Sequence, residues 1–444
     1  MTVRCLASLE SSHGVTRVRW ECLCVALQPG LILMRPPHKA SLQSFCLCTA
    51  LLRACESTRA SISALTLVSS VTMLEAIQSL ASLRWRSQPP QFRPLPEHIE
   101  RVFVTTSSGD LELLISRPKE PSDHGSSPPV FFAHGGYGSA GVWIEWMDHL
   151  HRSGYQGVLY AYSLRNHGAS YPVPSFHMVW GTPLDAFADD LLACIEYAQR
   201  DARSHYLAVV GHSSGPGLLQ YLLANSRLQA RALCLVDAIA HFGSYGVYWN
   251  WFKTDPWFPL RSWLHLQHPT SPLSSDRLVK QAFFGRRFPQ ESVSEFRRWM
   301  PAYESMRWAM GMCGNLWSWW KGRPQWLNAR DIVQNISQSS GEDQRARICI
   351  MVGSEDMMID TDICSLQAAQ YREAISSRSP SADKKASPIR GQRSRPDSAS
   401  LEGVHTEEAG RVRLVVIAGA GHHCQNDVQR DRGAVALQRF LEQV

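Results

Sequence analysis

The sequence feature that most limits the possible folds is a short segment that changes abruptly from one secondary structure to another. Residues 206–210 form an apolar run typical of a buried strand, and residues 216–224 have the spacing of a helix. Between them lies the sequence Gly-His-Ser-Ser-Gly at positions 211–215. A chain that turns so sharply leaves the central Ser213 exposed at the tip and strains its backbone, and the flanking glycines avoid a steric clash. The segment therefore predicts a strand–turn–helix unit with an exposed serine.

The rest of the chain repeats this alternation of strands and helices. Short apolar strands are predicted at 130–133, 157–161, 232–236, 348–352 and 414–417, and helices at 140–153, 182–195 and 428–443. Such strands are typical of a mostly parallel sheet with helices on both faces. Two further strand-like runs, 101–106 and 111–116, are joined by a turn and add an antiparallel hairpin. We therefore predict the α/β class with a mixed, mostly parallel central sheet.

A serine hydroxyl needs an adjacent base to act as a nucleophile at neutral pH. The sequence Ala-Gly-Ala-Gly-His-His at positions 418–423 follows the last predicted strand. Its loop therefore leaves the sheet at the same edge as Ser213, where open α/β sheets bind ligands. His422 is our candidate for the base, and His423 is the alternative.

The base must be oriented by an acid that also stabilises its cationic form. Asp356 lies in the loop after the strand at 348–352, again at this edge of the sheet, and is our candidate. Three other acids remain as alternatives: Glu355, Asp360, and Asp237 at the end of the strand at 232–236. The three candidates thus occur in the order Ser213, Asp356, His422, each shortly after a strand.

A tetrahedral oxyanion needs preorganised N–H donors. The backbone N–H of Ser214, at the start of a helix, is the first candidate. The second is Gly136 or Tyr137, in the glycine-rich loop that follows the strand at 130–133, because glycines let a backbone approach a substrate closely. These residues form the predicted oxyanion hole.

Composition and charge narrow the class of partner. Of the 444 residues 44% are hydrophobic, which allows a sizeable core, and the net charge is +6. Residues 1–72, with seven Lys or Arg and three Asp or Glu, carry much of this charge, so the remainder lacks the concentrated basic face that nucleic acids require. No apolar run is long enough to span a bilayer, and no motif implies a metal or a cofactor. We expect no nucleic-acid partner, no stable membrane insertion and a cytoplasmic location.

The domain organisation follows from changes in composition. Residues 1–97 are predicted to be a poorly ordered leader; they are rich in Arg and Ser, so a mitochondrial leader or a true start at Met73 stays open. The core comprises 98–239 and 336–444, interrupted by a helical insertion at 240–335 that holds ten of the fifteen tryptophans. A second insertion at 376–409 has hardly an apolar residue and is predicted to be disordered.

On these motifs the sequence resembles the α/β-hydrolase superfamily, in its serine esterase and hydrolase branch. Residues 134–136 are similar to the family's oxyanion motif, and Gly211 to Gly215 to its nucleophile elbow. The segment Ser-Leu-Arg-Asn-His-Gly-Ala-Ser, residues 163–170, is similar to the family's Asp-x-Arg-Gly-His-Gly-x-Ser, but Ser163 replaces the aspartate and Asn166 a glycine. The resemblance implies that the insertion at 240–335 is a lid over the active site, with most of its tryptophans in the lid's own core. The chain also looks like fungal hydrolases associated with polyketide and peptide pathways.

Together these features predict a serine hydrolase that cleaves an ester or thioester of a hydrophobic small molecule. An acyltransferase with the same residues, a hydrolase of carbon–carbon bonds, and a non-catalytic ligand-binding protein remain as alternatives. The sequence leaves the oligomeric state open.

Overall fold

The central element of the fold is a nine-stranded sheet in the described part of the chain. The computed structural model describes residues 2–12, 15–25, 83, 92–119, 127–336, 347–377 and 402–444. The strand order is β10-β11-β9-β8-β7-β5-β6-β4-β3. The six middle strands pair in parallel: β5 (Val130–Ala133), β6 (Leu159–Tyr162), β7 (Ala208–His212), β8 (Ala232–Val236), β9 (Ile348–Gly353) and β11 (Val412–Ile417). This arrangement confirms the predicted α/β class.

Antiparallel strands border the parallel ones at both edges. The hairpin of β3 (Ile99–Thr105) and β4 (Asp110–Ser116) joins the sheet through β6, as the turn between the two runs predicts. At the other edge β10 (Val404–Ala409) pairs with β11. This corrects the predicted disordered insertion 376–409: β10 lies inside it, and residues 378–401 lie outside the described part. An edge strand needs no apolar residues, because its backbone hydrogen bonds alone hold it to its neighbour.

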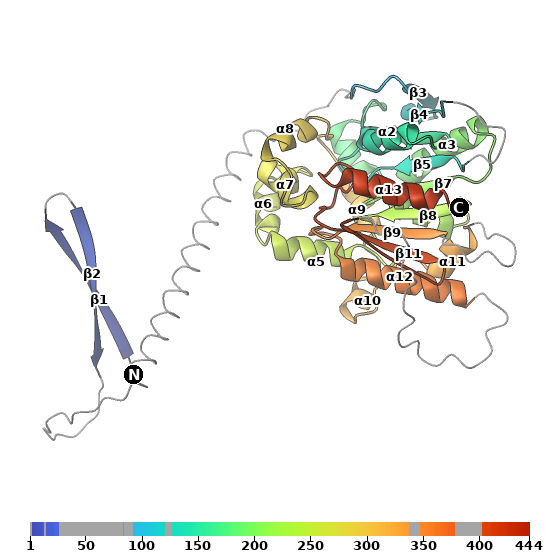
Figure 1. Ribbon diagram of the computed structural model, residues 1–444. Coiled ribbons are helices and arrows are strands. Elements are labelled where there is room, and N and C mark those ends of the chain that lie inside the picture. The colour runs from blue at the N-terminus through green and yellow to red at the C-terminus, as the bar shows by residue number, and fades with distance from the viewer. Residues whose placement is uncertain are drawn as a thin grey trace, which may run out of the picture. The chain divides into compact units, whose positions relative to one another are not determined.

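Helices cover both faces of the sheet (Figure 1). On one face lie α2 (Ile144–Arg152) and α13 (Arg430–Leu441), which pack on strand residues such as Phe132 and Val210. On the other face lie α3 (Leu184–Asp201), α4 (Gly215–Ala224) and α12 (Thr361–Ser376), against Phe131 and Val209. Successive strand side chains point to opposite faces, so the six parallel strands are buried on both sides.

The segment 240–335 consists largely of short helices. It contains α5 (Tyr245–Thr254), α6 (Phe258–Leu264), α7 (Asp276–Phe283), α8 (Gln290–Arg298), α9 (Met306–Gly311), α10 (Leu316–Trp320) and α11 (Ala329–Gln334). The segment also contains a short helix of another type, η3 (Ser271–Leu273). Two more, η1 (Ala140–Trp143) and η2 (His177–Gly181), precede it in the chain. The expectation that most of the insertion's tryptophans fill its core is wrong, because only Trp308 among them is buried. The helices are too short and too peripheral to enclose so many large rings.

The predicted leader contains one described pair of strands. β1 (Thr2–Ser12) and β2 (Val15–Val25) pair antiparallel, with Thr2 opposite Val25. Contacts divide the chain into residues 1–68, which include this pair, and 69–444, which include the sheet. The remainder of the leader up to residue 91, including Met73 and excepting residue 83, lies outside the described residues.

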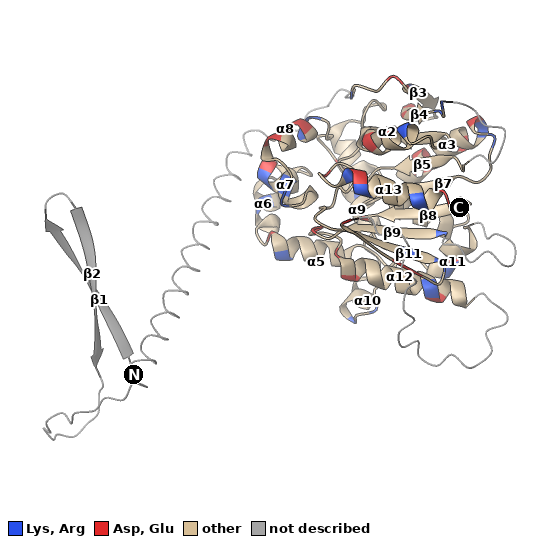
Figure 2. Cartoon of the chain, in the orientation of Figure 1, with Lys and Arg blue, Asp and Glu red and all other residues tan. Residues whose placement is uncertain are grey.

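Charged residues are spread over the main sheet's helices. Figure 2 shows both blue and red positions on helices such as α2, α3 and α13. In the described part of the chain no helix has the length and apolarity needed to cross a membrane.

Candidate active site

Ser213 lies at the tip of the turn between β7 and α4. Its φ of 59° falls in the left-handed region, which a residue other than glycine adopts only under strain. Two backbone hydrogen bonds hold this conformation: Ser213 N–H donates to Val236 O at 3.0 Å, and Ile239 N–H donates to Ser213 O at 2.8 Å. A Cβ on Gly211 would lie 2.8 Å from Pro216 Cγ, so the turn requires glycine there.

The structure brings Ser213, His422 and Asp356 together in one chain of hydrogen bonds. Ser213 Oγ lies 2.9 Å from His422 Nε2, and His422 Nδ1 lies 2.7 Å from Asp356 Oδ2. The other carboxylate oxygen of Asp356 accepts from Met358 N–H at 2.7 Å and Ile359 N–H at 3.0 Å. The fixed carboxylate therefore aims the imidazole, with its Nδ1 proton toward Asp356 and its Nε2 lone pair toward the serine.

The alternative base, His423, does not contact Ser213 in the structure. Its ring is buried, and its Nδ1 lies 3.3 Å from the amide nitrogens of Gln425 and Asn426. Burial and the neighbouring His422 hold its pKa well below the ordinary value. His423 is therefore a neutral core residue.

The three alternative acids have other partners. Glu355 accepts from the backbone N–H and the guanidinium of Arg286. Asp360 caps α12 by accepting from Ile363 N–H at 2.9 Å. Asp237 accepts from Gly353 N–H at 2.8 Å, and burial together with the charge of Asp356 raises its pKa well above the ordinary value. The raised pKa favours the neutral form of Asp237, which lacks the negative charge that stabilises an imidazolium.

The predicted oxyanion donors lie around Ser213, but two of them already have partners. Gly136 N–H donates to Ser214 Oγ at 2.8 Å. Tyr137, whose φ is 59°, donates its N–H to Glu304 Oε2 at 2.9 Å. Glu304 could not be placed here by sequence reasoning, because it lies in the helical insertion and belongs to no motif.

The sequence matches the alpha/beta hydrolase family over residues 130–436, a range that includes Ser213, Asp356 and His422. The chain belongs to the alpha/beta hydrolase family. The superfamily resemblance and the expectation of an α/β-hydrolase are thereby confirmed.

The hydrolase is also similar to several solved structures. A soluble variant of monoglyceride lipase from Saccharomyces cerevisiae has 15% identity over 80% of this chain and 98% of that chain, with a TM-score of 0.48. A putative aryl esterase from Burkholderia cenocepacia has 18% identity over 77% and 98%, with a TM-score of 0.44. A bacterial membrane phospholipase A has 14% identity over 90% and 98%, with a TM-score of 0.46. The family assignment rests on the match over residues 130–436.

The hydrolase departs from the family's pattern at Ser163, and a neighbouring strand compensates for the missing carboxylate. Glu112 of β4 is buried, and its Oε2 accepts from Ser163 Oγ at 2.6 Å and Ala169 N–H at 2.9 Å. Its Oε1 accepts from Arg101 Nε at 2.7 Å. The second departure, Asn166, has a φ of 63°, a conformation that asparagine tolerates better than most residues.

The helical insertion is attached to the loop that carries His422. Buried Asp427 accepts with one oxygen, Oδ2, from Gly285 N–H at 2.7 Å and Gly421 N–H at 2.8 Å. His423 N–H donates to Phe283 O at 2.8 Å, and the Phe283 ring lies 6.0 Å from that of His422. The end of α7 is thus both a wall beside the candidate base and a support for its loop.

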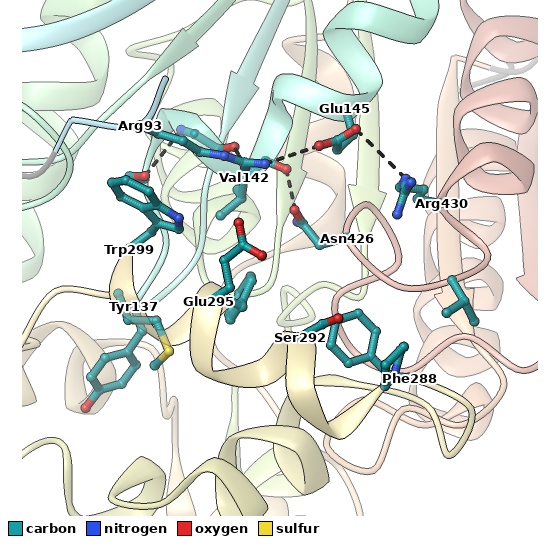
Figure 3. A pocket seen from close by; sticks show the side chains of 16 residues that line it. Arg93, Tyr137, Val142, Glu145, Phe288, Ser292, Glu295, Trp299, Asn426 and Arg430 are labelled. Atoms are coloured by element: carbon teal, nitrogen blue, oxygen red, sulfur yellow. Dashed lines mark hydrogen bonds and ion pairs between the residues drawn. The ribbon is translucent and has the colours of Figure 1, made fainter. Parts of the chain in front are cut away.

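A cavity of about 330 Å³ lies between α2, α8 and the loop that precedes α13 (Figure 3). Charged groups (Arg93, Glu145, Glu295 and Arg430) and the rings of Tyr137, Phe288, Phe296 and Trp299 are among its lining. Ser213, Asp356 and His422 do not line it, and Tyr137 is its link to the glycine loop. In the described part of the hydrolase no His, Cys, Asp or Glu cluster has the arrangement of a metal site.

Proposed function

We propose that this protein is a serine hydrolase that cleaves esters or thioesters of hydrophobic small molecules. The observation that carries the proposal is the continuous chain of hydrogen bonds from Ser213 Oγ through His422 to Asp356, at 2.9 and 2.7 Å. Family membership supports the hydrolytic class.

In this mechanism Ser213 Oγ attacks the carbonyl carbon while His422 Nε2 takes its proton. Asp356 stabilises the imidazolium that forms. His422 then gives the proton to the leaving alcohol or thiol as its bond to the carbonyl carbon breaks. A water molecule, deprotonated by His422, attacks the resulting acyl-enzyme, and the acid and free Ser213 are released.

Backbone N–H groups stabilise the oxyanion in both halves of the reaction. Ser214 N–H, at the start of α4, is one donor, and Gly136 or Tyr137 supplies the other. The helical insertion 240–335 acts as the lid. The position of Phe283 beside His422 is evidence for an apolar acyl or leaving group in the substrate. The resemblance to fungal hydrolases supports polyketide- and peptide-derived thioesters as test substrates.

The first experiment treats the purified full chain with a fluorophosphonate probe and locates the adduct by mass spectrometry. Labelling is expected at Ser213, absent in Ser213→Ala and weaker in His422→Ala. A folded protein that resists the probe and hydrolyses none of a panel of esters and thioesters would instead favour the ligand-binding alternative.

Activity assays with and without added alcohols and amines separate hydrolysis from acyl transfer. Free acid as the main product at millimolar acceptor supports the hydrolase. Acyl-acceptor product that dominates over the acid would make the protein an acyltransferase.

The expected cytoplasmic location stays a prediction, which microscopy of the tagged full chain tests.

A further inference from the structure

A carboxyl group from the helical insertion reaches the glycine loop beside Ser213. Glu304 is 8% exposed, and its Oε2 accepts from Tyr137 N–H at 2.9 Å. A Cβ placed on Gly136 would lie 3.4 Å from that oxygen and 3.7 Å from Ser214 Oγ. The carboxyl group therefore occupies space in front of the amide groups proposed as oxyanion donors.

The backbone around Glu304 is firmly anchored. Ser305 Oγ donates to Thr182 O at 2.6 Å and accepts from Trp308 N–H at 3.1 Å, which caps α9. Ser305 N–H also donates to Glu304 Oε1 at 3.0 Å. Because these hydrogen bonds hold the backbone, the carboxyl group of Glu304 has a fixed position in the site.

Buried His167 holds the same oxygen from the other side. Its Nδ1 lies 2.8 Å from Arg165 O and must donate to that carbonyl, and its Nε2 lies 3.1 Å from Glu304 Oε2. Two acceptors cannot face one another at this distance, so one proton is shared between Nε2 and the carboxyl group. Burial acts to lower the pKa of His167, but the charge and hydrogen bond of Glu304 outweigh it and raise that pKa overall.

A substrate whose oxyanion is held by Tyr137 N–H disturbs this arrangement. When its carbonyl oxygen takes the N–H of Tyr137, the buried carboxyl group of Glu304 loses one of its donors. An unsatisfied polar group in a buried site is costly, so a plain acyl chain reacts at a disadvantage. A hydroxyl or amino group on the substrate can replace the lost donor.

We propose that Glu304, oriented by His167, forms a polar subsite that selects acyl groups with a hydrogen-bond donor close to the scissile carbonyl. The donor belongs on the α or β carbon, because the carbonyl oxygen and the carboxyl oxygen share the neighbourhood of one N–H group. This inference rests on the proposed function and narrows its substrate class to hydroxylated or aminated acyl esters and thioesters.

The test compares p-nitrophenyl butanoate with the p-nitrophenyl esters of its α-hydroxy and β-hydroxy derivatives. The readout is the ratio of kcat/KM for the better hydroxylated ester to that for the plain one, corrected for spontaneous hydrolysis. We expect the wild-type protein to favour the hydroxylated ester by about tenfold, the effect of one hydrogen bond in a buried site. A wild-type ratio near one overturns the inference without any variant.

Variants assign the preference to Glu304. Glu304→Met should bring the ratio close to one, because the hydroxylated ester loses its hydrogen-bond partner in the subsite. Glu304→Gln keeps an acceptor and a donor in the same place and should keep most of the preference. Glu295→Met removes another carboxylate of the insertion, which lines the cavity of Figure 3, and should leave the ratio unchanged.

A purely structural role for Glu304 gives a different pattern. Glu304→Met would then lower kcat/KM for both esters equally and leave the ratio at its wild-type value, which overturns the inference. Fluorophosphonate labelling of Ser213 separates a failure of the polar subsite from a failure of the proposed function. Labelling with equal rates for all esters rejects the polar subsite alone, whereas no labelling and no hydrolysis rejects the proposed function.

Discussion

At the scale of single residues, Asp356 has the most specific contacts in the site. Asp356→Asn keeps the size of the side chain and an oxygen for Met358 N–H, but it removes the charge that stabilises a protonated His422. We expect kcat to fall by about 10³- to 10⁴-fold with little change in folding. Steady-state kinetics and a thermal melt check this.

Its neighbour provides the control for this substitution. Glu355→Gln alters only the contact with Arg286 and should leave kcat within about twofold. A loss of less than tenfold in kcat for Asp356→Asn would mean that another acid supports the base.

Gly135 is a second residue with a specific steric requirement. A Cβ at this position would lie 2.5 Å from Ser213 Cβ and 2.8 Å from His212 O, so Gly135→Ala must displace the turn that carries the serine. A displacement of about 1 Å costs about a hundredfold in rate, which kcat/KM with a p-nitrophenyl ester would report.

Gly246→Ala in α5 is the matched control for Gly135→Ala. Its nearest neighbour would be the flexible tip of Ile363 at 3.3 Å, so near-wild-type activity is expected. Equal activity of both alanine variants would show that the glycine loop tolerates a side chain.

Ser213, Asp356 and His422 could be proposed from the sequence because each follows a buried strand, and strands are visible in a single sequence. Glu304 and Glu112 could not be found in this way. Their partners lie far away along the chain, in Tyr137 and His167 for one and in Ser163 for the other. A contact made by the tertiary fold has no local periodicity to reveal it.

At the scale of elements, the segment that contains Ser163 is held against α3 by an ion pair. Arg165 Nε and Nη2 each lie 2.6 Å from an oxygen of Asp190, whose side chain is 3% exposed. Asp190→Asn leaves a half-buried guanidinium without its counter-charge, and we expect a loss of about 3 kcal/mol in the free energy of unfolding. Chemical denaturation measures it.

The preceding residue of α3 is the natural comparison. Asp189 pairs with Arg227 on the surface and is 62% exposed, so Asp189→Asn should cost under about 1 kcal/mol. Similar losses in the two variants would mean that the Arg165 pair contributes no more than a surface contact.

Elements were predictable where they are buried. Buried strands are visible in the sequence as apolar runs, because both of their faces are covered. This holds for β5, β7, β8, β9 and β11. The edge strand β10 has largely polar, exposed side chains, so nothing in its composition distinguishes it from a loop. The prediction for the tryptophans of the insertion is wrong for the opposite reason, because it takes large apolar side chains to be buried, whereas many of these are exposed.

At the scale of the whole molecule, several buried histidines make the fold sensitive to acid. Burial lowers the pKa of His134 to about 3 and that of His241 to about 4, and the pKa values of His212 and His423 are also well below the ordinary value. Below pH about 6.5 these histidines take up protons in the unfolded chain but stay neutral in the folded chain. Each such histidine then removes about 1.4 kcal/mol of stability per pH unit.

We therefore expect the melting temperature to fall steadily between pH 7 and pH 5. This stability is fully present above the unfolded pKa and is lost as the pH falls toward the folded values. His167 does not offset the loss below pH about 6.5, because the stability that comes from its raised pKa is already fully present there and no longer changes with pH. Calorimetry across this range tests the prediction, and a melting temperature that is flat or rises toward pH 5 contradicts it.

The shared hydrogen bonds of Asp427 have a mechanical consequence. One carboxylate oxygen holds both Gly285, at the end of α7, and Gly421, next to the candidate base. An outward swing of α7 would move the loop of the candidate base away from Ser213. In the proposed mechanism, substrates therefore enter elsewhere, and this side of the insertion is a fixed support for the loop that carries His422.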